Sequence, residues 1–164
     1  LPLIEKADEG RIVIVSAKLH DKVDHLVLGT IDDEKAFAPL DAYNKSKLAN
    51  IMHARELTRR LRAMGNKTVT ANSLHPGVFP SELLRHLGPL KYKIITTIGA
   101  YTIMKTERDG AQTSLFLALS PKVKGLSGFY FSDCALAEEE SHVARDDLAC
   151  KQLYDYSLKA VGLE

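Results

Sequence analysis

Short apolar runs and one long periodic stripe divide the chain into strand and helix segments. The β-branched runs at 11–16 and 68–74 are typical of strands buried on both faces of a parallel sheet, and 127–132 is a third strand candidate. Between the first two runs, apolar residues recur every three or four positions from Tyr43 to Leu61, which predicts an amphipathic helix. A strand, a helix and a second strand form a βαβ unit, so the pattern predicts an α/β fold.

Two further helices are predicted from their start signals. Thr106-Glu-Arg-Asp109 resembles a capping box that opens a helix to about Leu119. Ser141 is expected to cap a final helix, because the residues after it form an apolar line at helical spacing: Ala149, Leu153, Tyr156 and Ala160. The sequence has no internal repeats or low-complexity segments, so we expect a single partial domain over residues 1–164.

The composition is that of an ordinary globular protein. Hydrophobic residues make up 45% of the 164 positions, charged residues 26%, and the net charge is +1. The basic residues are dispersed, so we expect no nucleic-acid partner. Cys134 and Cys150 form no metal spacing, which predicts no metal site and two reduced thiols. We therefore expect an intracellular protein, either cytoplasmic or associated with an organelle membrane.

The strongest candidate for chemistry is the pair Tyr43 and Lys47. Residues four apart lie on one face of a helix, so the phenol and the ammonium are predicted to be neighbours. A cation about 4–6 Å away favours the phenolate and is expected to lower the tyrosine pKa. Such a tyrosine exchanges a proton with an alcohol or carbonyl oxygen near neutral pH. Because no side chain donates hydride, the hydride must come from a cofactor.

A second pair, Tyr101 and Lys105, has the same spacing but lacks this setting. The segment around Tyr43 lies between two predicted strands and continues into an apolar helical stripe, whereas Tyr101 has no such frame. Functional groups of α/β proteins gather at the carboxyl ends of parallel strands. We therefore interpret Tyr43 as the functional residue and Tyr101 as a packing residue.

Five motifs in order resemble the short-chain dehydrogenase/reductase family, in its retinol dehydrogenase and WW-domain oxidoreductase branch. They cover the chain from about residue 10 to residue 160, and they are Ser16-x-x-x-His20, Ala42-Tyr-Asn-Lys-Ser-Lys-Leu-Ala-Asn50, His75-Pro-Gly-Val-Phe-Pro-Ser-Glu-Leu83, Gly110-Ala-Gln-Thr-Ser114 and Gly125-Leu-Ser-Gly-Phe-Tyr-Phe-Ser132. The resemblance implies the carboxyl-terminal part of a Rossmann-like, doubly wound parallel sheet. It would have about three parallel strands with flanking helices, and the amino-terminal cofactor half would be missing.

The same resemblance implies roles for particular residues and an NADP or NAD cofactor. Tyr43 would be the acid/base, and Lys47 would lower its pKa and hydrogen-bond the nicotinamide ribose. The cofactor-binding set would comprise these two residues together with Pro76, Gly77, Val78 and Ser81. Taken without the resemblance, Pro76 and Gly77 are a turn that ends a strand.

The resemblance also implies a small lipophilic substrate, such as a retinoid or a sterol. In the family the segment 82–104 forms a flap over the substrate, and its apolar residues suit such a compound. Core packing and a homodimer contact are alternatives for the same residues. Membrane association is expected, if at all, through an amino-terminal region outside this chain.

Two departures from the family weaken the catalytic interpretation. The ten glycines form no Gly-rich phosphate motif, and the chain begins at Leu1, so we expect a piece of a longer enzyme. The family's second strand-end serine, the catalytic one, is Ala17 here. Ser16 remains a candidate for the third catalytic residue, although alternate strand residues face opposite sides. The alternative for Ser16 is a strand-end serine bound to the main chain.

Two functional hypotheses follow from the sequence. In the first, the chain belongs to an NAD(P)-dependent oxidoreductase that interconverts a lipophilic alcohol and a carbonyl compound through Tyr43 and Lys47. In the second, it is a catalytically inactive fragment or pseudoenzyme with a binding role only. Ala17 and the absence of a phosphate loop favour the second hypothesis for the chain alone, whereas the retained Tyr43 and Lys47 favour the first.

Overall fold

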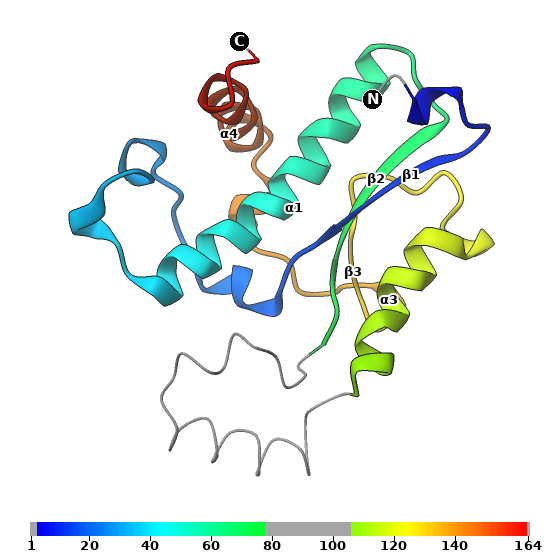
Figure 1. The fold of residues 1–164 in the computed structure, drawn as a ribbon, viewed down its shortest axis with the longest axis horizontal. Helices are drawn as coiled ribbons and strands as arrows, with labels where there is room; N and C mark the ends of the chain where they lie inside the picture. Colours follow the sequence, from blue (N-terminus) through cyan, green and yellow to red (C-terminus); the bar gives the residue numbers. More distant parts are fainter. Residues whose placement is uncertain (1–2, 78–105, 164) are drawn as a thin grey trace.

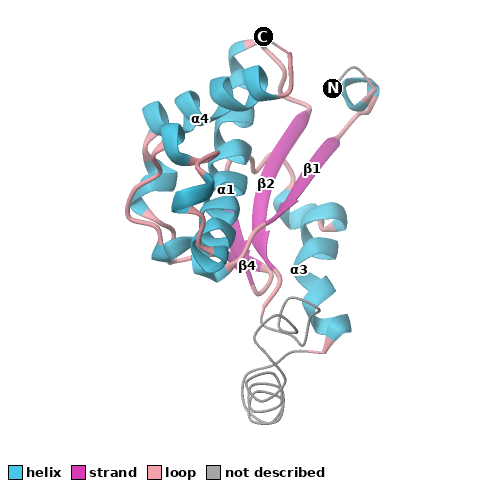
Figure 2. Cartoon of the chain, turned by 60° about the vertical axis from the view of Figure 1, so that its left-hand side comes forward, coloured by secondary structure: helices cyan, strands magenta, loops and turns pink. Residues whose placement is uncertain are grey.

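The fold is a central sheet with helices on both faces (Figure 1), seen in a computed structural model that describes residues 3–77 and 106–163. The strands are β1 (Gly10–Val15), β2 (Val69–His75), β3 (Tyr130–Ser132) and β4 (Ala135–Leu136), and the α-helices are α1 (Pro39–Ala63), α3 (Glu107–Leu119) and α4 (Asp147–Ala160). Short 3-10 helices are η1 (Ile4–Lys6), η2 (Lys18–Lys22), η3 (Leu28–Thr30), η4 (Glu34–Ala36), η6 (Pro121–Val123) and η7 (His142–Arg145). Helices α1 and α4 cover one face of the sheet and α3 covers the other (Figure 2).

The sheet has the order β1-β2-β3-β4. β1 and β3 both pair with β2 in parallel, and β4 pairs with β3 in antiparallel orientation. Three parallel strands with helices on both faces confirm the predicted α/β class and its partial doubly wound sheet. Among the described residues β1 has a partner on one side only, so it is an edge strand.

The antiparallel strand β4 is a feature that the sequence analysis did not predict. Ser132 pairs with Ala135, so the β3–β4 hairpin turns through two residues. Both of them, Asp133 and Cys134, have positive φ angles, 52° and 59°. Such two-residue turns favour Asn-Gly or Asp-Gly, and the sequence has neither of these signals here. The hairpin was missed because a non-glycine residue occupies a conformation that usually marks glycine.

The bounds of two elements differ from expectation for local reasons. β3 begins at Tyr130 instead of 127, because Gly128 has a φ of 84°, outside the strand region. Ser141 caps only η7, through a hydrogen bond from the Val143 amide. The final helix, α4, begins at Asp147, and the Asp146 side chain accepts from the amides of its first turn. By contrast, the capping box of Thr106 and Asp109 is confirmed at the start of α3.

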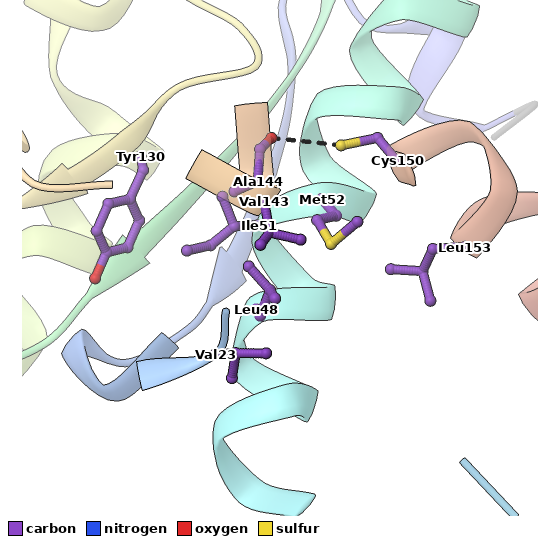
Figure 3. Packing of buried hydrophobic residues seen from close by; sticks show 9 residues of the cluster. All are labelled: Val23, Leu48, Ile51, Met52, Tyr130, Val143, Ala144, Cys150 and Leu153. Carbon is purple, nitrogen blue, oxygen red and sulfur yellow. Dashed lines mark hydrogen bonds between the residues drawn. The ribbon is translucent and has the colours of Figure 1, made fainter. Parts of the chain in front are cut away.

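The largest core cluster lies between α1, α4 and the sheet (Figure 3). Its buried members are Val23, Leu48, Ile51, Met52, Tyr130, Val143, Ala144, Cys150 and Leu153. Within it the Cys150 thiol donates a hydrogen bond of 3.4 Å to the Ala144 carbonyl, and burial raises the pKa of this thiol to about 12. A second cluster on the α3 face is formed by Leu74, Leu117, Val123 and Phe131. The first cluster fixes α1 against α4 and the sheet, and the second fixes α3 against the opposite face.

The helices of the described residues are too short or too polar to cross a membrane. A span needs about 20 mostly apolar residues. No helix within 3–77 and 106–163 meets both the length and the apolarity required.

Candidate active site

Helix α1 brings the predicted acid/base pair together. Its start is set by Pro39 in the first turn, where a proline is tolerated because no helical N–H is lost. Its residues Leu48, Ile51 and Met52 pack into the core, and Tyr43 and Lys47 nearer its start are partly buried. The Lys47 Nζ atom lies 5.5 Å from the centroid of the Tyr43 ring. The expected neighbourhood of phenol and ammonium is therefore present.

The effect on the phenol is opposite to the one expected. Burial raises the pKa of Tyr43 above its ordinary value of 10.0. The expectation of a lowered pKa was wrong for the chain by itself, and the geometry gives the reason. Lys47 lies over the ring, in a cation–π arrangement, and this contact does not offset the loss of water around the phenol.

Ser16 lies just beyond the end of β1 and binds the main chain of α1. Its side chain is buried, and its Oγ donates a hydrogen bond of 2.7 Å to the carbonyl of Lys47. Ser16 is thus a strand-end serine whose hydroxyl binds the main chain. Nearby, Asn50 Nδ2 donates to the Val15 carbonyl at 3.0 Å. The end of β1 is thus tied to the helical turn that carries Lys47.

Ala17 is also buried and leads from β1 into η2. Its main chain is extended, with φ −151° and ψ 156°. The Ser16 amide continues the sheet pairing by donating to the Leu74 carbonyl at 2.7 Å. Position 17, where the family resemblance expects a serine, is therefore the first residue beyond the ladder of β1 and β2.

The Pro76–Gly77 turn follows directly from the end of β2. Gly77 has a φ of 94°, a conformation that side chains rarely adopt and that lets a main chain approach a ligand closely. Just before it, His75 Nδ1 accepts a hydrogen bond of 3.3 Å from the Lys18 amide, which joins the ends of β1 and β2. Val78 and Ser81 lie outside the described residues, as do the flap 82–104 and the pair Tyr101 and Lys105.

Two cavities flank this region of the molecule. One, of about 400 Å³, lies at the carboxyl ends of the parallel strands and is lined among others by Lys18, His20, His75, Tyr130 and Ser132. The other, of about 190 Å³, lies between the segment 26–38 and α1 and is mostly apolar. Neither of these two linings includes Tyr43 or Lys47. Ligands of open α/β sheets bind at carboxyl strand ends, which is where the first cavity lies.

The donor set suits one end of a nicotinamide dinucleotide. A phenol, an ammonium and a glycine turn of positive φ can contact a ribose and a ring carboxamide, and Tyr43, Lys47 and Gly77 supply them. The sequence contains no glycine-rich motif for the pyrophosphate. The residues present therefore fit the nicotinamide-ribose end of the cofactor, and they offer no phosphate loop.

Comparisons with known proteins identify the family of the chain. The chain is 40% identical over 164 residues to retinol dehydrogenase 14 of Homo sapiens, in an alignment covering 99% of this chain and 47% of that protein. It is 35% identical over 159 residues to short-chain dehydrogenase TIC 32 B, chloroplastic, of Brassica napus, covering 96% and 48%. The chain belongs to the short-chain dehydrogenase/reductase family. The resemblance inferred from the motifs is thereby confirmed.

Further comparisons define the extent of this similarity. Dehydrogenase/reductase SDR family member 13 of Bos taurus is 37% identical over 171 residues, covering 99% of this chain and 42% of that protein. The chain thus spans about half the length of the curated relatives it matches. The crystal structure of an uncharacterized protein from Mycobacterium paratuberculosis has the same fold, with a TM-score of 0.56 and 22% identity, covering 91% of this chain and 49% of that one. No model of a protein family matches the chain.

One residue of this region was not assigned a role from the sequence. His20 belongs to the first family motif, yet nothing in its spacing distinguishes it from the exposed His25. In the structure it is 1% exposed and hydrogen-bonded through both ring nitrogens. The burial and the hydrogen bonds of His20 depend on segments far apart in sequence, so only the structure reveals them.

Proposed function

We propose that this chain belongs to an NAD(P)-dependent oxidoreductase that interconverts an alcohol and a carbonyl compound. The observation that carries the proposal is the contact of Lys47 Nζ with the Tyr43 ring, beside the carboxyl ends of the parallel strands. The relatives support this proposal because their names describe them as dehydrogenases or reductases. The whole-protein activity is proposed here because the chain covers about half of each relative.

In the proposed reaction Tyr43 moves the proton. In the reducing direction the phenol O–H donates its proton to the carbonyl oxygen, and in the oxidising direction the phenolate accepts the alcohol proton. When bound, the nicotinamide dinucleotide donates or accepts the hydride. Lys47 would stabilise the phenolate by its positive charge and hydrogen-bond a ribose hydroxyl. Pro76 and Gly77 would bring main-chain groups to the nicotinamide, together with Val78 and Ser81.

The proposed substrate is a small lipophilic alcohol or aldehyde of the retinoid or sterol type. Its support is the naming of several relatives as retinol dehydrogenases, whose stated substrate is a lipophilic alcohol. The choice between NAD and NADP stays open. A homodimer, an intracellular location and a membrane attachment outside this chain also stay predictions.

A second candidate function rests on two specific observations. Ala17 removes a hydroxyl at the strand end, and loss of one transition-state donor lowers a rate by roughly 10²–10³. Burial also raises the Tyr43 pKa above its ordinary value, so less phenolate is present at neutral pH to accept a proton. These favour a catalytically inactive protein with a binding role for the chain by itself.

Dinucleotide binding tests a requirement of the enzyme proposal. Fluorescence titration with NADH and NADPH is performed on this chain and on a form extended by the residues encoded upstream. The enzyme proposal predicts saturable binding by the extended form, weakened about tenfold or more in Lys47→Ala because an ammonium–ribose hydrogen bond is lost. The matched control is Lys45→Ala, since the Lys45 ammonium pairs with Asp41 at 2.7 Å. Absence of binding by the extended form would overturn the enzyme proposal.

A further inference from the structure

Three consecutive residues after β1 are each held by a hydrogen bond to a different element. The Ser16 hydroxyl binds the Lys47 carbonyl in α1, and the Lys18 amide binds His75 Nδ1 at the end of β2. Between them, the Ala17 carbonyl accepts from His20 Nδ1 at 2.8 Å and from the His20 amide at 3.2 Å. The main chain that follows β1 is therefore held by hydrogen bonds to α1, η2 and β2.

The partners of His20 determine which ring nitrogen carries the proton. Nε2 lies 3.3 Å from the Ser141 amide, which can only donate, so Nε2 accepts. Nδ1 faces the Ala17 carbonyl, which can only accept, so Nδ1 carries the hydrogen. His20 is thus a neutral imidazole in the Nδ1–H form. A doubly protonated ring would place two N–H groups against each other at Ser141.

The ring of His20 joins three parts of the chain that are distant in sequence. Its edge packs against the ring of Tyr130 in β3, with centroids 4.7 Å apart and planes at 68°. Its Nε2 holds Ser141, the residue that begins η7. The η7 residues Val143 and Ala144 lie in the same buried cluster as Leu48 and Ile51 of α1. Through this one ring, position 17 is anchored to the core that also supports the catalytic helix.

We propose that His20, in its neutral Nδ1–H form, is a positioning residue for the oxidoreductase site. It holds the main chain of position 17 where the family resemblance expects the substrate-binding hydroxyl, and it couples that position to the segment after Ser141. This inference rests on the proposed function for its catalytic consequence. Its structural half, the protonation form and the two hydrogen bonds, stands independently of any activity.

The protonation form is tested on the unmodified chain. Long-range ¹H–¹⁵N correlation spectra of the histidine-labelled protein distinguish the Nδ1–H and Nε2–H forms by their ring nitrogen shifts. We expect one histidine, assigned to His20 by its loss in His20→Phe, to show the Nδ1–H pattern. An Nε2–H pattern or a protonated ring at neutral pH would overturn the inference. The spectrum itself is recorded on the unmodified chain, and His20→Phe serves only to assign the signal.

Amide hydrogen exchange tests the positioning role. His20→Phe keeps the ring contact with Tyr130 but removes both ring hydrogen bonds, so the Ser141 amide loses its acceptor and should exchange about tenfold faster. The Lys18 amide, which donates to His75, should also exchange faster because the main chain at position 17 is no longer held by the His20 ring. The amides of β2 should keep their rates, which a general loss of stability would not allow. The matched control is His25→Phe, at an exposed histidine of the following segment. Equal acceleration throughout the sheet would assign His20 a merely structural role.

The catalytic consequence is measured in the extended form carrying Ala17→Ser, which restores the expected hydroxyl. Adding His20→Phe should lower kcat about tenfold or more and leave KM for the dinucleotide within about threefold, because misplacement affects the reacting end. An unchanged kcat in an active enzyme would overturn the positioning role and leave the proposed function intact. Absence of turnover in every form, with dinucleotide binding or without it, would instead overturn the proposed function together with this catalytic half.

Discussion

The side-chain hydroxyl of Ser16 and the main-chain carbonyl of Lys47 are joined by a hydrogen bond of 2.7 Å. It links the carboxyl end of β1 to the helical turn that carries the lysine of the proposed acid/base pair. The Asn50 amide adds a second link one residue earlier in the strand, at the Val15 carbonyl. A serine that appears in sequence as a catalytic candidate is therefore placed to hold the site together.

We expect Ser16→Ala to lower the free energy of unfolding by about 1 kcal/mol, because a buried hydrogen bond is lost. Urea denaturation of the chain measures this change. Ser46→Ala is the matched control: its hydroxyl also donates to a main-chain carbonyl, that of Tyr43, at 2.7 Å, but it is exposed. Its loss should change stability by less than about 0.5 kcal/mol. If Ser16→Ala abolished the activity of the extended form without lowering stability, Ser16 would be the third catalytic residue.

An ionic network between α1 and α4 predicts how stability depends on pH. Glu56 is 1% exposed and accepts from Arg59 and Arg60, and the Arg60 guanidinium also pairs with Asp155 of α4. The hydrogen bond from Arg59, opposed by burial and assisted by Arg60, holds the pKa of Glu56 below its ordinary value of 4.5. A lowered folded pKa means that the contribution is complete above 4.5 and is lost as the pH falls through the folded pKa.

We therefore expect the unfolding free energy to fall below about pH 4.5, and Glu56→Gln to remove part of that dependence. At pH 7 the same substitution should cost about 2 kcal/mol, since one charged acceptor serves two partly exposed arginines. Denaturation midpoints measured between pH 3 and pH 7 provide the comparison. Glu34→Gln, at an exposed position, is the control. A parallel pH profile for parent and Glu56→Gln would contradict a lowered pKa of Glu56 in the folded chain.

The β3–β4 hairpin predicts a stabilising substitution. Cys134 has a φ of 59°, a conformation that glycine adopts without steric penalty. Cys134→Gly should therefore raise the unfolding free energy by about 0.5–1 kcal/mol. Cys134→Ala, which also removes the thiol but keeps a Cβ atom, should give no such gain. A stabilisation of equal size in both variants would trace the effect to the thiol and not to the backbone.

The parts of the fold that were predictable are those encoded by local pattern. The β-branched run before Ser16 and the stripe from Tyr43 to Leu61 each specify a buried element, and the observed β1 and α1 follow them closely. The Thr106 capping box also specifies its helix start without tertiary help. The β4 hairpin was not predictable, because Asp133 and Cys134 carry positive φ angles without a glycine.

In the site, too, local pattern predicts some features and tertiary packing determines the others. Helical spacing alone placed Lys47 beside Tyr43, but it could not tell whether the ammonium meets the phenol oxygen or the ring face. Nor could it show how far the phenol is buried, and burial is what raises the pKa of Tyr43. The role of His20 depends on Ser141, 121 residues away in sequence, so no local pattern could reveal it.

Turnover by Tyr43→Phe tests the central claim most directly. In the extended form, with NAD or NADP and a retinol-type alcohol, the initial rate of dinucleotide reduction is compared between parent and variant. Because Tyr43 is proposed to transfer the proton, the variant should lose a factor of about 10²–10⁴ in rate while the dinucleotide Kd stays within about threefold. Tyr101→Phe, at the other tyrosine of the same spacing, should retain the parental rate. A Tyr43→Phe rate equal to that of the parent, or an equal loss in Tyr101→Phe, would contradict the assignment of Tyr43 as the acid/base.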